Sequence, residues 1–287
     1  MPAVRNRFAP YLLILPGGLW LAVFFVIPML AMVSVSLQTG SLESGFQQSF
    51  NWHNYTDMIS QYHTQLIRSF VYGLVTTVLA ILLAYPVAYW IAFRGGRHKS
   101  TYLFLILLPF FVTFVIRTIS WQFLLADDGI VLGHLKDWHL LPQSFHILAT
   151  PYAVVGGLVY NFLPFMVLPI YVALERIDRS LLEAASDLFA NKRDRFLQVV
   201  LPLSLPGVFA GVILTFVPAA SDYVNAQILG GSGQVMIGNI IETLYLTNSQ
   251  YPQASALSSI LLAALLIGIF AYAKALGTRD VMDASAA

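Results

Sequence analysis

The chain has 287 residues, of which 58% are hydrophobic and only 10% are charged. A soluble domain carries about 25% charged residues, so this chain cannot cover a water-facing surface, and we expect a lipid bilayer to be its solvent. The net charge of +1 offers no basic footprint for a nucleic acid, and the absence of cysteine excludes disulfides, zinc–thiolate sites and cysteine nucleophiles.

Several apolar segments are long enough to cross a membrane as helices, which takes about 20 residues. In chain order they cover roughly 11–37, 70–93, 102–125, 149–174, 199–221 and 254–273. The first exceeds the core of a cleaved signal peptide, about 7–15 residues, so we expect it to remain as a span. Thr150 and Pro151 open the fourth as an N-cap and a first-turn proline. The sequence therefore predicts an all-α membrane protein with six transmembrane helices in one domain, 1–287.

The basic residues set the expected orientation, because cytoplasmic loops are enriched in lysine and arginine. With the N-terminus inside, 12 of the 15 basic residues fall on the cytoplasmic side. They are Arg5, Arg7, Arg94, Arg97, Lys99, Arg176, Arg179, Lys192, Arg193, Arg195, Lys274 and Arg279. With six spans, both termini are then expected in the cytoplasm.

The loop 175–200 between the fourth and fifth spans is dense in charge and contains a predicted helix. Ser180 fits the N-cap of a capping box, with Glu183 reaching back from the third helical position. Leu181, Ala185, Leu188 and Phe189 recur at helical spacing as an apolar stripe. We therefore expect a short amphipathic helix that ends near Asn191.

Two interpretations of this helix remain open on spacing alone. In one, it lies at the membrane surface and Glu183 merely caps it, since capping boxes are common. In the other, its apolar stripe fills a groove on an ATP-hydrolysing partner, and its acidic face, Glu183 and Asp187, meets basic residues there.

The stretch from Glu183 to Val208 resembles the EAA loop of binding-protein-dependent ABC importer permeases. The matching positions are Glu183, Ala184, Ala185, Leu188, Ala190, Phe196, Val199, Leu201, Pro202, Pro206 and Gly207. Phe189 departs from the pattern, because the family usually has glycine there. Phenylalanine suggests that the helix continues and that its ring fills partner or intramolecular space.

This resemblance implies a type I importer permease fold with a cytoplasmic coupling helix that two ATP-binding subunits push. The coupling residues would be Ser180, Glu183, Ala184, Ala185, Asp187, Leu188 and Phe189. The chain has no Gly-x-x-x-x-Gly-Lys-Ser/Thr sequence, and Gly95–Ser100 has the wrong spacing for one. We therefore expect no cofactor in this chain, with ATP and Mg²⁺ held by the partner ATPase.

A wider resemblance, from about Asn51 to Leu262, is to the spermidine/putrescine permeases. It rests on Asn54-Tyr55, Ala84–Tyr89, Leu108–Phe110, Ile116–Thr118, Trp121, Gly156–Tyr160, Leu163–Met166, Leu229–Gly231 and Met236–Asn239. The same subfamily includes importers of other small organic or inorganic solutes, so another substrate remains open.

A path for a polyamine should offer carboxylates and aromatic faces, because a cation–π contact contributes about 0.5–2 kcal/mol. Asp222, at the end of the fifth span beside Tyr223, is the candidate carboxylate. Its alternative is a harmless, exposed position in the outer interface. The aromatic candidates are Tyr85, Tyr89, Trp121 and Tyr160, although aromatic residues in apolar helices are more often packing residues.

Arg117 is the one charged residue that the predicted third span contains. It could pair with Asp222 across the bundle or extend to the interface. A free Arg117 in a polyamine path would repel the substrate, so a structural partner is expected.

The sequence thus predicts a non-catalytic, multi-pass permease subunit in a bacterial inner membrane, importing a small solute by alternating access, with a polyamine as the favoured substrate. Its expected partners are a second permease subunit, a dimeric ATP-binding subunit, a periplasmic substrate-binding protein and the lipid bilayer. An ion-driven secondary transporter would require paired intramembrane acids and an inverted repeat, and neither is visible.

Overall fold

The structure, a computed structural model, describes residues 9–275. Arg5, Arg7 and Arg279, on which part of the expected orientation depends, lie outside the described residues. Within 9–275, five helices are long and apolar enough to cross a membrane, and a sharply bent pair brings the number to six if it counts as one span. The prediction of a helical, multi-span protein is confirmed.

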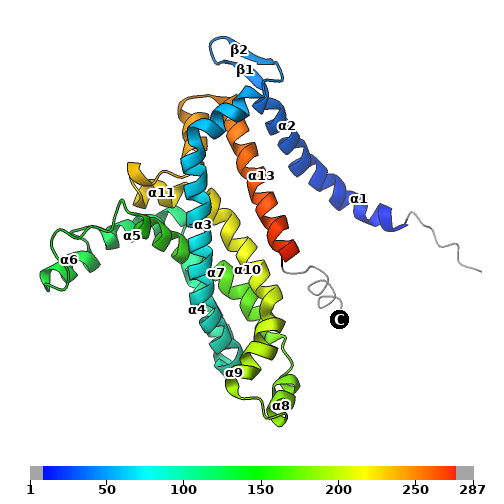
Figure 1. The fold of residues 1–287 in the computed structure, drawn as a ribbon, viewed down its shortest axis with the longest axis vertical. Helices are drawn as coiled ribbons and strands as arrows, with labels where there is room; N and C mark the ends of the chain where they lie inside the picture. The colour runs from blue at the N-terminus through cyan, green and yellow to red at the C-terminus, as the bar shows by residue number, and fades with distance from the viewer. Residues whose placement is uncertain (1–8, 276–287) are drawn as a thin grey trace, which may run out of the picture. The chain divides into compact units, whose positions relative to one another are not determined.

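The helices follow one another along the chain as Figure 1 shows. They are α1 (Ala9–Leu21), α2 (Ile27–Ser36), α3 (His53–Arg94), α4 (Lys99–Leu107), α5 (Phe114–Leu125), α6 (Ile130–Asp137), α7 (Pro151–Glu175), α8 (Arg179–Asp187), α9 (Lys192–Arg195), α10 (Leu201–Ser221), α11 (Val224–Leu229), α12 (Ile237–Glu242) and α13 (Tyr251–Ala275). A π-helical turn, Phe196–Val200, joins α9 to α10, so helix runs without a break from Lys192 to Ser221.

The chain forms two compact units, and the expectation of a single domain stays a prediction. The smaller unit contains residues 9–63 and 241–264. Within it, a two-stranded antiparallel hairpin, β1 (Gln38–Ser41) and β2 (Gly45–Gln48), follows α2, with Gln38 opposite Gln48. The buried Asn54 of α3 donates through Nδ2 to the carbonyl oxygens of Ser36 and Gln38, at 2.8 and 2.9 Å. This side chain therefore fixes the start of α3 against the end of α2.

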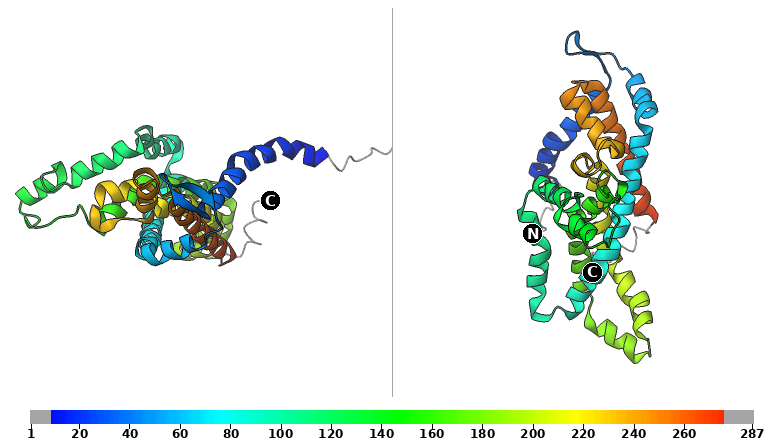
Figure 2. Two further views of the ribbon diagram at one scale, coloured as in Figure 1. Left: turned by 90° about the horizontal axis from the view of Figure 1, so that it is seen from above. Right: turned by 90° about the vertical axis from the view of Figure 1, so that its left-hand side faces the viewer.

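The larger unit contains residues 64–240 and 265–275. Its centre is the packing of α7 on α10, which lie side by side in Figure 1 and Figure 2. Small residues allow close approach, as is usual between membrane helices: Ala80, Ala84 and Ala88 of α3 are fully buried against Met166 and Ile170 of α7.

The predicted third span, 102–125, is wrong as a single helix. Two helical segments, Gly96–Phe111 and Phe114–Asp137, meet at an angle of 91°. Pro109 has no N–H to continue the helical ladder, and the chain is extended at Val112 and Thr113 before α5 begins. Phe110 and Arg117, which one straight span would align, lie on opposite sides of this bend.

The other span limits differ mainly at their polar ends. The fourth span is confirmed as α7, with Thr150 as the N-cap that accepts from the Ala153 amide and Pro151 in the first turn. The helix α3, which contains the second span, begins much earlier than expected, at His53, but the non-helical backbone at Tyr62 marks a kink where two helical segments meet. The fifth begins at Lys192, because Asn191 caps a polar first turn that hydropathy alone does not detect.

Candidate functional site

The α8 loop, which we define as residues 176–195, folds as a capped helix followed by a tight turn. The predicted N-cap, Ser180, is wrong: the cap is Asp178, whose Oδ1 accepts from the Ser180 amide at 2.9 Å. That hydrogen bond favours the ionised carboxylate, so it lowers the pKa of Asp178 below its ordinary value. Asp178 thus satisfies the Ser180 amide, because the helix already starts at Arg179, one residue before the predicted cap.

The end of α8 corrects the expectation for Phe189. The helix stops at Asp187, and Phe189 adopts φ +60°, the left-handed conformation that glycine favours. The amide of Ala190 donates to the Ala185 carbonyl and that of Phe189 to the Ser186 carbonyl, both at 3.0 Å. The bond from Ala190, with the left-handed residue before it, is that of a Schellman turn. Phenylalanine therefore takes the backbone shape expected of the family's glycine instead of extending the helix.

The side chains of the α8 loop divide into an inner and an outer group. Leu182 packs on the buried cluster of Ile177, Leu174 and Val200, as does Phe196 directly after the loop. Ser180, Glu183, Ala184 and Asp187 belong to the outer group, with Leu188 and Phe189 at 82% and 96% exposure. The Phe189 ring thus fills no space among the described residues. The outer group presents acidic and apolar side chains together on a surface that the packing of the inner group holds in place.

An ion pair holds the α8 loop beside the other short loop of this unit. Lys99, at the start of α4, contacts the carboxylate of Glu175, at the end of α7, at 2.8 Å. Both loops therefore lie at the same end of the larger unit, as expected from the count of spans between them. Figure 1 shows α8 and α9 at this end of α7 and α10.

A second polar site lies inside the larger unit, between α5, α7 and α11. Thr118, Asn161 and Asn225 are each fully buried there. The Asn161 amide nitrogen donates to Thr118 Oγ1 at 3.2 Å and to Asn225 Oδ1 at 3.1 Å. Gly157 permits this approach, because a Cβ there would lie 2.8 Å from Asn225 Oδ1. We call Thr118, Asn161 and Asn225 the polar cluster.

The polar cluster is only partly satisfied. Within the described residues, Asn161 Oδ1 and Asn225 Nδ2 have no hydrogen-bond partner. An unsatisfied buried polar group costs about 1–3 kcal/mol, so such groups usually mark water, a ligand or a second conformation.

Asp222 lies directly beside the polar cluster. It is 8% exposed, so the alternative of a harmless, exposed position is wrong. Its Oδ1 accepts from the backbone amide of Asn225 at 2.7 Å, which ties the break after α10 to the start of α11. Tyr223 is more open, at 43% exposure, and its carbonyl accepts from Asn239 Nδ2 at 2.7 Å.

Arg117 does not pair with Asp222. Within residues 9–275 it forms no ion pair, and its Nε and Nη1 have no hydrogen-bond partner although it is only 8% exposed. Its guanidinium carbon lies 4.5 Å from the centre of the Phe110 ring and 5.7 Å from that of Phe114. The expected structural partner of Arg117 is thus aromatic rather than acidic.

The four aromatic candidates divide between two places. Trp121 and Tyr160 contact each other edge to face, with ring centres 5.3 Å apart. Tyr85 and Tyr89 instead pack on Phe196 near the α8 loop, and the Tyr85 hydroxyl lies 2.7 Å from Ser204 Oγ. The structure therefore does not assemble all four into one lining.

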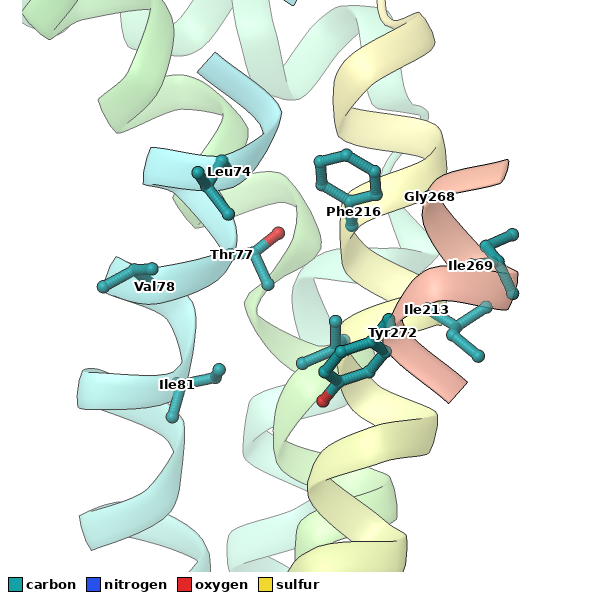
Figure 3. Close-up of a pocket in the computed structure, with 10 residues that line it drawn as sticks. Leu74, Thr77, Val78, Ile81, Ile213, Phe216, Gly268, Ile269 and Tyr272 are labelled. Atoms are coloured by element: carbon teal, nitrogen blue, oxygen red, sulfur yellow. The ribbon is translucent and has the colours of Figure 1, made fainter. Parts of the chain in front are cut away.

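The larger unit also has an apolar crevice of about 300 Å³ between α3, α10 and the end of α13 (Figure 3). Leu74, Phe216 and Tyr272 are among its lining residues, and Gly268 opens one wall. The hydroxyl of Thr77, another lining residue, already donates to the Gly73 carbonyl oxygen at 2.7 Å. Because the described residues that line it are all uncharged, the crevice is unsuited to a polycation.

Sequence reasoning did not single out the polar cluster. Asn161 is the only amide side chain in the predicted fourth span, and this isolated polar residue was the available signal. Asn225 follows Asp222 by three residues, the spacing of a side-chain turn. For the aromatic support of Arg117, the available signal was Phe114, three residues earlier in the same helix, whereas the contact with Phe110 crosses the bend.

Several apolar spans, a buried polar cluster and an exposed, capped helix between two of the spans define a membrane-spanning transport subunit. The family model of the binding-protein-dependent transport system inner membrane component matches residues 67–277. The chain belongs to this family and is a multi-pass protein of the inner membrane.

Similar curated proteins agree with this assignment. The spermidine/putrescine transport system permease protein PotB of Haemophilus influenzae is 35% identical over 276 residues, covering 96% of each chain. PotB of Escherichia coli K12 is 32% identical, over 89% of this chain and 94% of the relative. The inner membrane ABC transporter permease protein YdcU of E. coli K12 is 32% identical over 76% of this chain and 72% of its own.

A solved structure shows the same fold. A bacterial ABC transporter involved in the import of the acidic polysaccharide alginate aligns with a TM-score of 0.71 at 18% identity, over 94% of each chain. A bacterial alginate ABC transporter in complex with alginate pentasaccharide-bound periplasmic protein gives 0.69 at 19% identity, again over 94% of each chain. The fold is therefore that of ABC importer permeases.

Proposed function

We propose that this chain is the permease subunit of an ATP-driven importer of polyamines such as spermidine and putrescine. The observation that carries the proposal is the similarity to PotB proteins along nearly the whole chain. The chemistry beside the polar cluster agrees, because the buried carboxylate of Asp222 and the paired rings of Trp121 and Tyr160 suit an alkylammonium group.

The proposed coupling element is the α8 loop, on the cytoplasmic side. Glu183 and Asp187 form its outward acidic surface beside the exposed Ala184, and Leu188 and Phe189 extend beyond the helix end. A rigid partner groove that accepts the two apolar side chains and pairs with the acids would move this helix on closing. ATP and Mg²⁺ are then held by a dimeric partner ATPase, and this chain performs no catalysis.

The proposed assembly adds a second permease subunit and a periplasmic substrate-binding protein. The basic residues of the α8 loop and of the 94–101 loop favour a cytoplasmic location for these loops and for both termini. Substrate would cross by alternating access between the two permease subunits.

The testing experiment measures ATP hydrolysis by the lipid-reconstituted complex that co-purifies with this chain, with its periplasmic protein and with spermidine or putrescine added. Hydrolysis that rises with a polyamine is expected. Hydrolysis that ignores polyamines would leave the importer but discard the substrate. Purification without an ATPase would contradict the role of the α8 loop.

A further inference from the structure

Arg117 is held in an unusual way for a buried cation. It is only 8% exposed, yet within the described residues no acid pairs with it and two of its nitrogen atoms donate to nothing. Buried arginines normally satisfy their five donors with carboxylates or carbonyls. What remains is the contact of its guanidinium with the faces of Phe110 and Phe114.

These two rings belong to a larger aromatic group. The Phe110 ring lies edge to face on Phe165, with centres 5.2 Å apart, and the Phe114 ring lies 6.0 Å from Phe162. Phe162 and Phe165 are themselves 6.2 Å apart on α7. We call Phe110, Phe114, Phe162 and Phe165 the phenylalanine group. It joins both sides of the bend to α7 and presents negative ring faces to a cation.

The contact of Arg117 with Phe110 also spans the bend. Phe110 precedes the extended residues Val112 and Thr113, and Arg117 follows them. A change in the 91° angle between the two helical segments would therefore change this contact directly. Among the described residues, Arg117 has no side-chain hydrogen bond from Nε or Nη1 and no ion pair to keep it in place when that happens.

We propose that the faces of Phe110 and Phe114 are a binding site for an alkylammonium group, and that Arg117 occupies it as a tethered cation until substrate displaces it. The ligand class follows from the occupant, because ring faces that accept a guanidinium accept an ammonium by the same attraction. The Arg117 guanidinium and a substrate ammonium would repel each other on the same ring faces, so the substrate replaces Arg117 there instead of binding beside it.

This proposal rests on the proposed polyamine function, and it assigns Arg117 a specific part in it. A displaced Arg117 regains water for its unpaired donors, which offsets part of the loss of its aromatic contacts. Arg117 would thus weaken binding of the polyamine at rest, and it would return to the rings after the substrate leaves.

The test measures binding of radiolabelled spermidine to the assembled membrane complex in lipid nanodiscs, without the periplasmic protein, whose own affinity would mask the site. Arg117→Met removes the resident cation and keeps an apolar side chain. We expect it to tighten spermidine binding by about two- to thirtyfold, the range that one cation–π contact spans. Phe110→Leu in the Arg117→Met background should abolish the gain.

A pair of competitors tests the chemical class. In Arg117→Met, 1,8-diaminooctane should displace spermidine, whereas 1,8-octanediol, of the same length and without charge, should not. Equal displacement by both would overturn an ammonium site. Unchanged or weaker spermidine binding by an assembled Arg117→Met complex would overturn the role of Arg117 as a competitor.

The remaining outcome concerns the assembly of the variants with the other subunits. If Arg117→Met and Arg117→Gln both fail to assemble with the other subunits, Arg117 has a structural role and the proposal is overturned. If the wild-type complex neither binds polyamines nor hydrolyses ATP in response to them, the proposed function fails first. Wild-type stimulation combined with unchanged binding in Arg117→Met would contradict only the present inference.

Discussion

The α8 loop and the polar cluster satisfy their polar groups in opposite ways. In the α8 loop, Asp178 and Asn191 cap helix amides, and amides of the turn at Phe189 donate to the last carbonyl oxygens of α8. Apolar side chains of this loop face outward. In the polar cluster, side chains are fully buried, and among the described residues atoms of Asn161 and Asn225 lack partners. The hydrogen bonds of the α8 loop are complete before any partner binds, whereas those of the polar cluster are completed only by water, a ligand or a rearrangement.

That difference fits a machine that receives force at one end and handles solute within the bilayer. A contact surface transmits movement best when its own backbone cannot yield. A site that admits and releases a solute must not be saturated by its own chain, because specificity arises from groups left to pair with the ligand.

The largest effect that would break this comparison is expected at Glu183. Glu183→Arg places a like charge against the proposed basic surface of the ATPase, which costs several kcal/mol, so uptake should fall by about a hundredfold. Radiolabelled spermidine uptake by reconstituted vesicles measures it. Glu43→Arg, the same charge reversal at another exposed acid, is the matched control and should keep uptake. Normal uptake by Glu183→Arg would remove the coupling role.

The next effect tests charge in the buried region. Asp222→Asn keeps an oxygen that can accept from the Asn225 amide but removes the negative charge, so assembly should be retained. Uptake of spermidine should fall by about tenfold, as expected for loss of one buried partner of a cation. Asp128→Asn, at an exposed acid, serves as the control. Equal uptake by Asp222→Asn and wild type would leave Asp222 with its structural role alone.

A third prediction concerns the stability that the polar cluster supplies. Asn225→Ala leaves Asn161 and Thr118 without their shared acceptor, so the free energy of unfolding should fall by about 1–3 kcal/mol. Denaturation in mild detergent measures it. Gln227→Ala removes an exposed amide from the same short helix and should change stability by less than about 0.5 kcal/mol. Similar losses in both variants would show that the cluster contributes nothing specific.

A smaller effect is expected at the turn after α8. Phe189→Gly relieves the left-handed backbone strain of about 1 kcal/mol. Hydrogen exchange at the Ala190 amide, which bonds to the Ala185 carbonyl, should slow accordingly. Leu188→Gly, where φ is −82°, should not slow it. Weaker binding of the ATPase by Phe189→Gly, despite the firmer turn, would sharpen the comparison by separating the ring from the backbone.

The smallest effect is the titration of Asp178. Because the Ser180 amide lowers the pKa of this carboxylate in the folded state, its contribution to stability is present above the ordinary value of 3.8 and is lost as the pH falls through the lower folded value. A carbon-13 carboxyl titration should show that lower midpoint. Ser180→Pro removes the donor and should return it to the ordinary value. An ordinary midpoint in wild type would place the N-cap elsewhere.

Hydropathy and capping patterns predicted much of this structure, since most spans depend on local composition. The start of α7 was predictable from Thr150 and Pro151, which act within one turn. The bend at Val112 was not, because Pro109 is tolerated inside many membrane helices and only the packing around it decides whether the chain turns.

The candidate site was predictable where its signal is a sequence pattern. Composition and spacing predicted a helix in the α8 loop, but its N-cap at Ser180, its end near Asn191 and its continuation through Phe189 were wrong. The burial of Asp222 and the contact of Arg117 with Phe110 depend on breaks in the helices, which no regular spacing within one segment reveals.

The two apolar side chains beyond α8 have a consequence for the life of the chain before assembly. Leu188 and Phe189 are almost wholly uncovered on a loop outside the spans, which is the feature by which chaperones and proteases recognise orphan subunits. Copies made in excess of the other components would show this pair and be degraded, whereas assembled copies would hide it. The same turn would thereby adjust the number of transporters to the supply of the scarcest component.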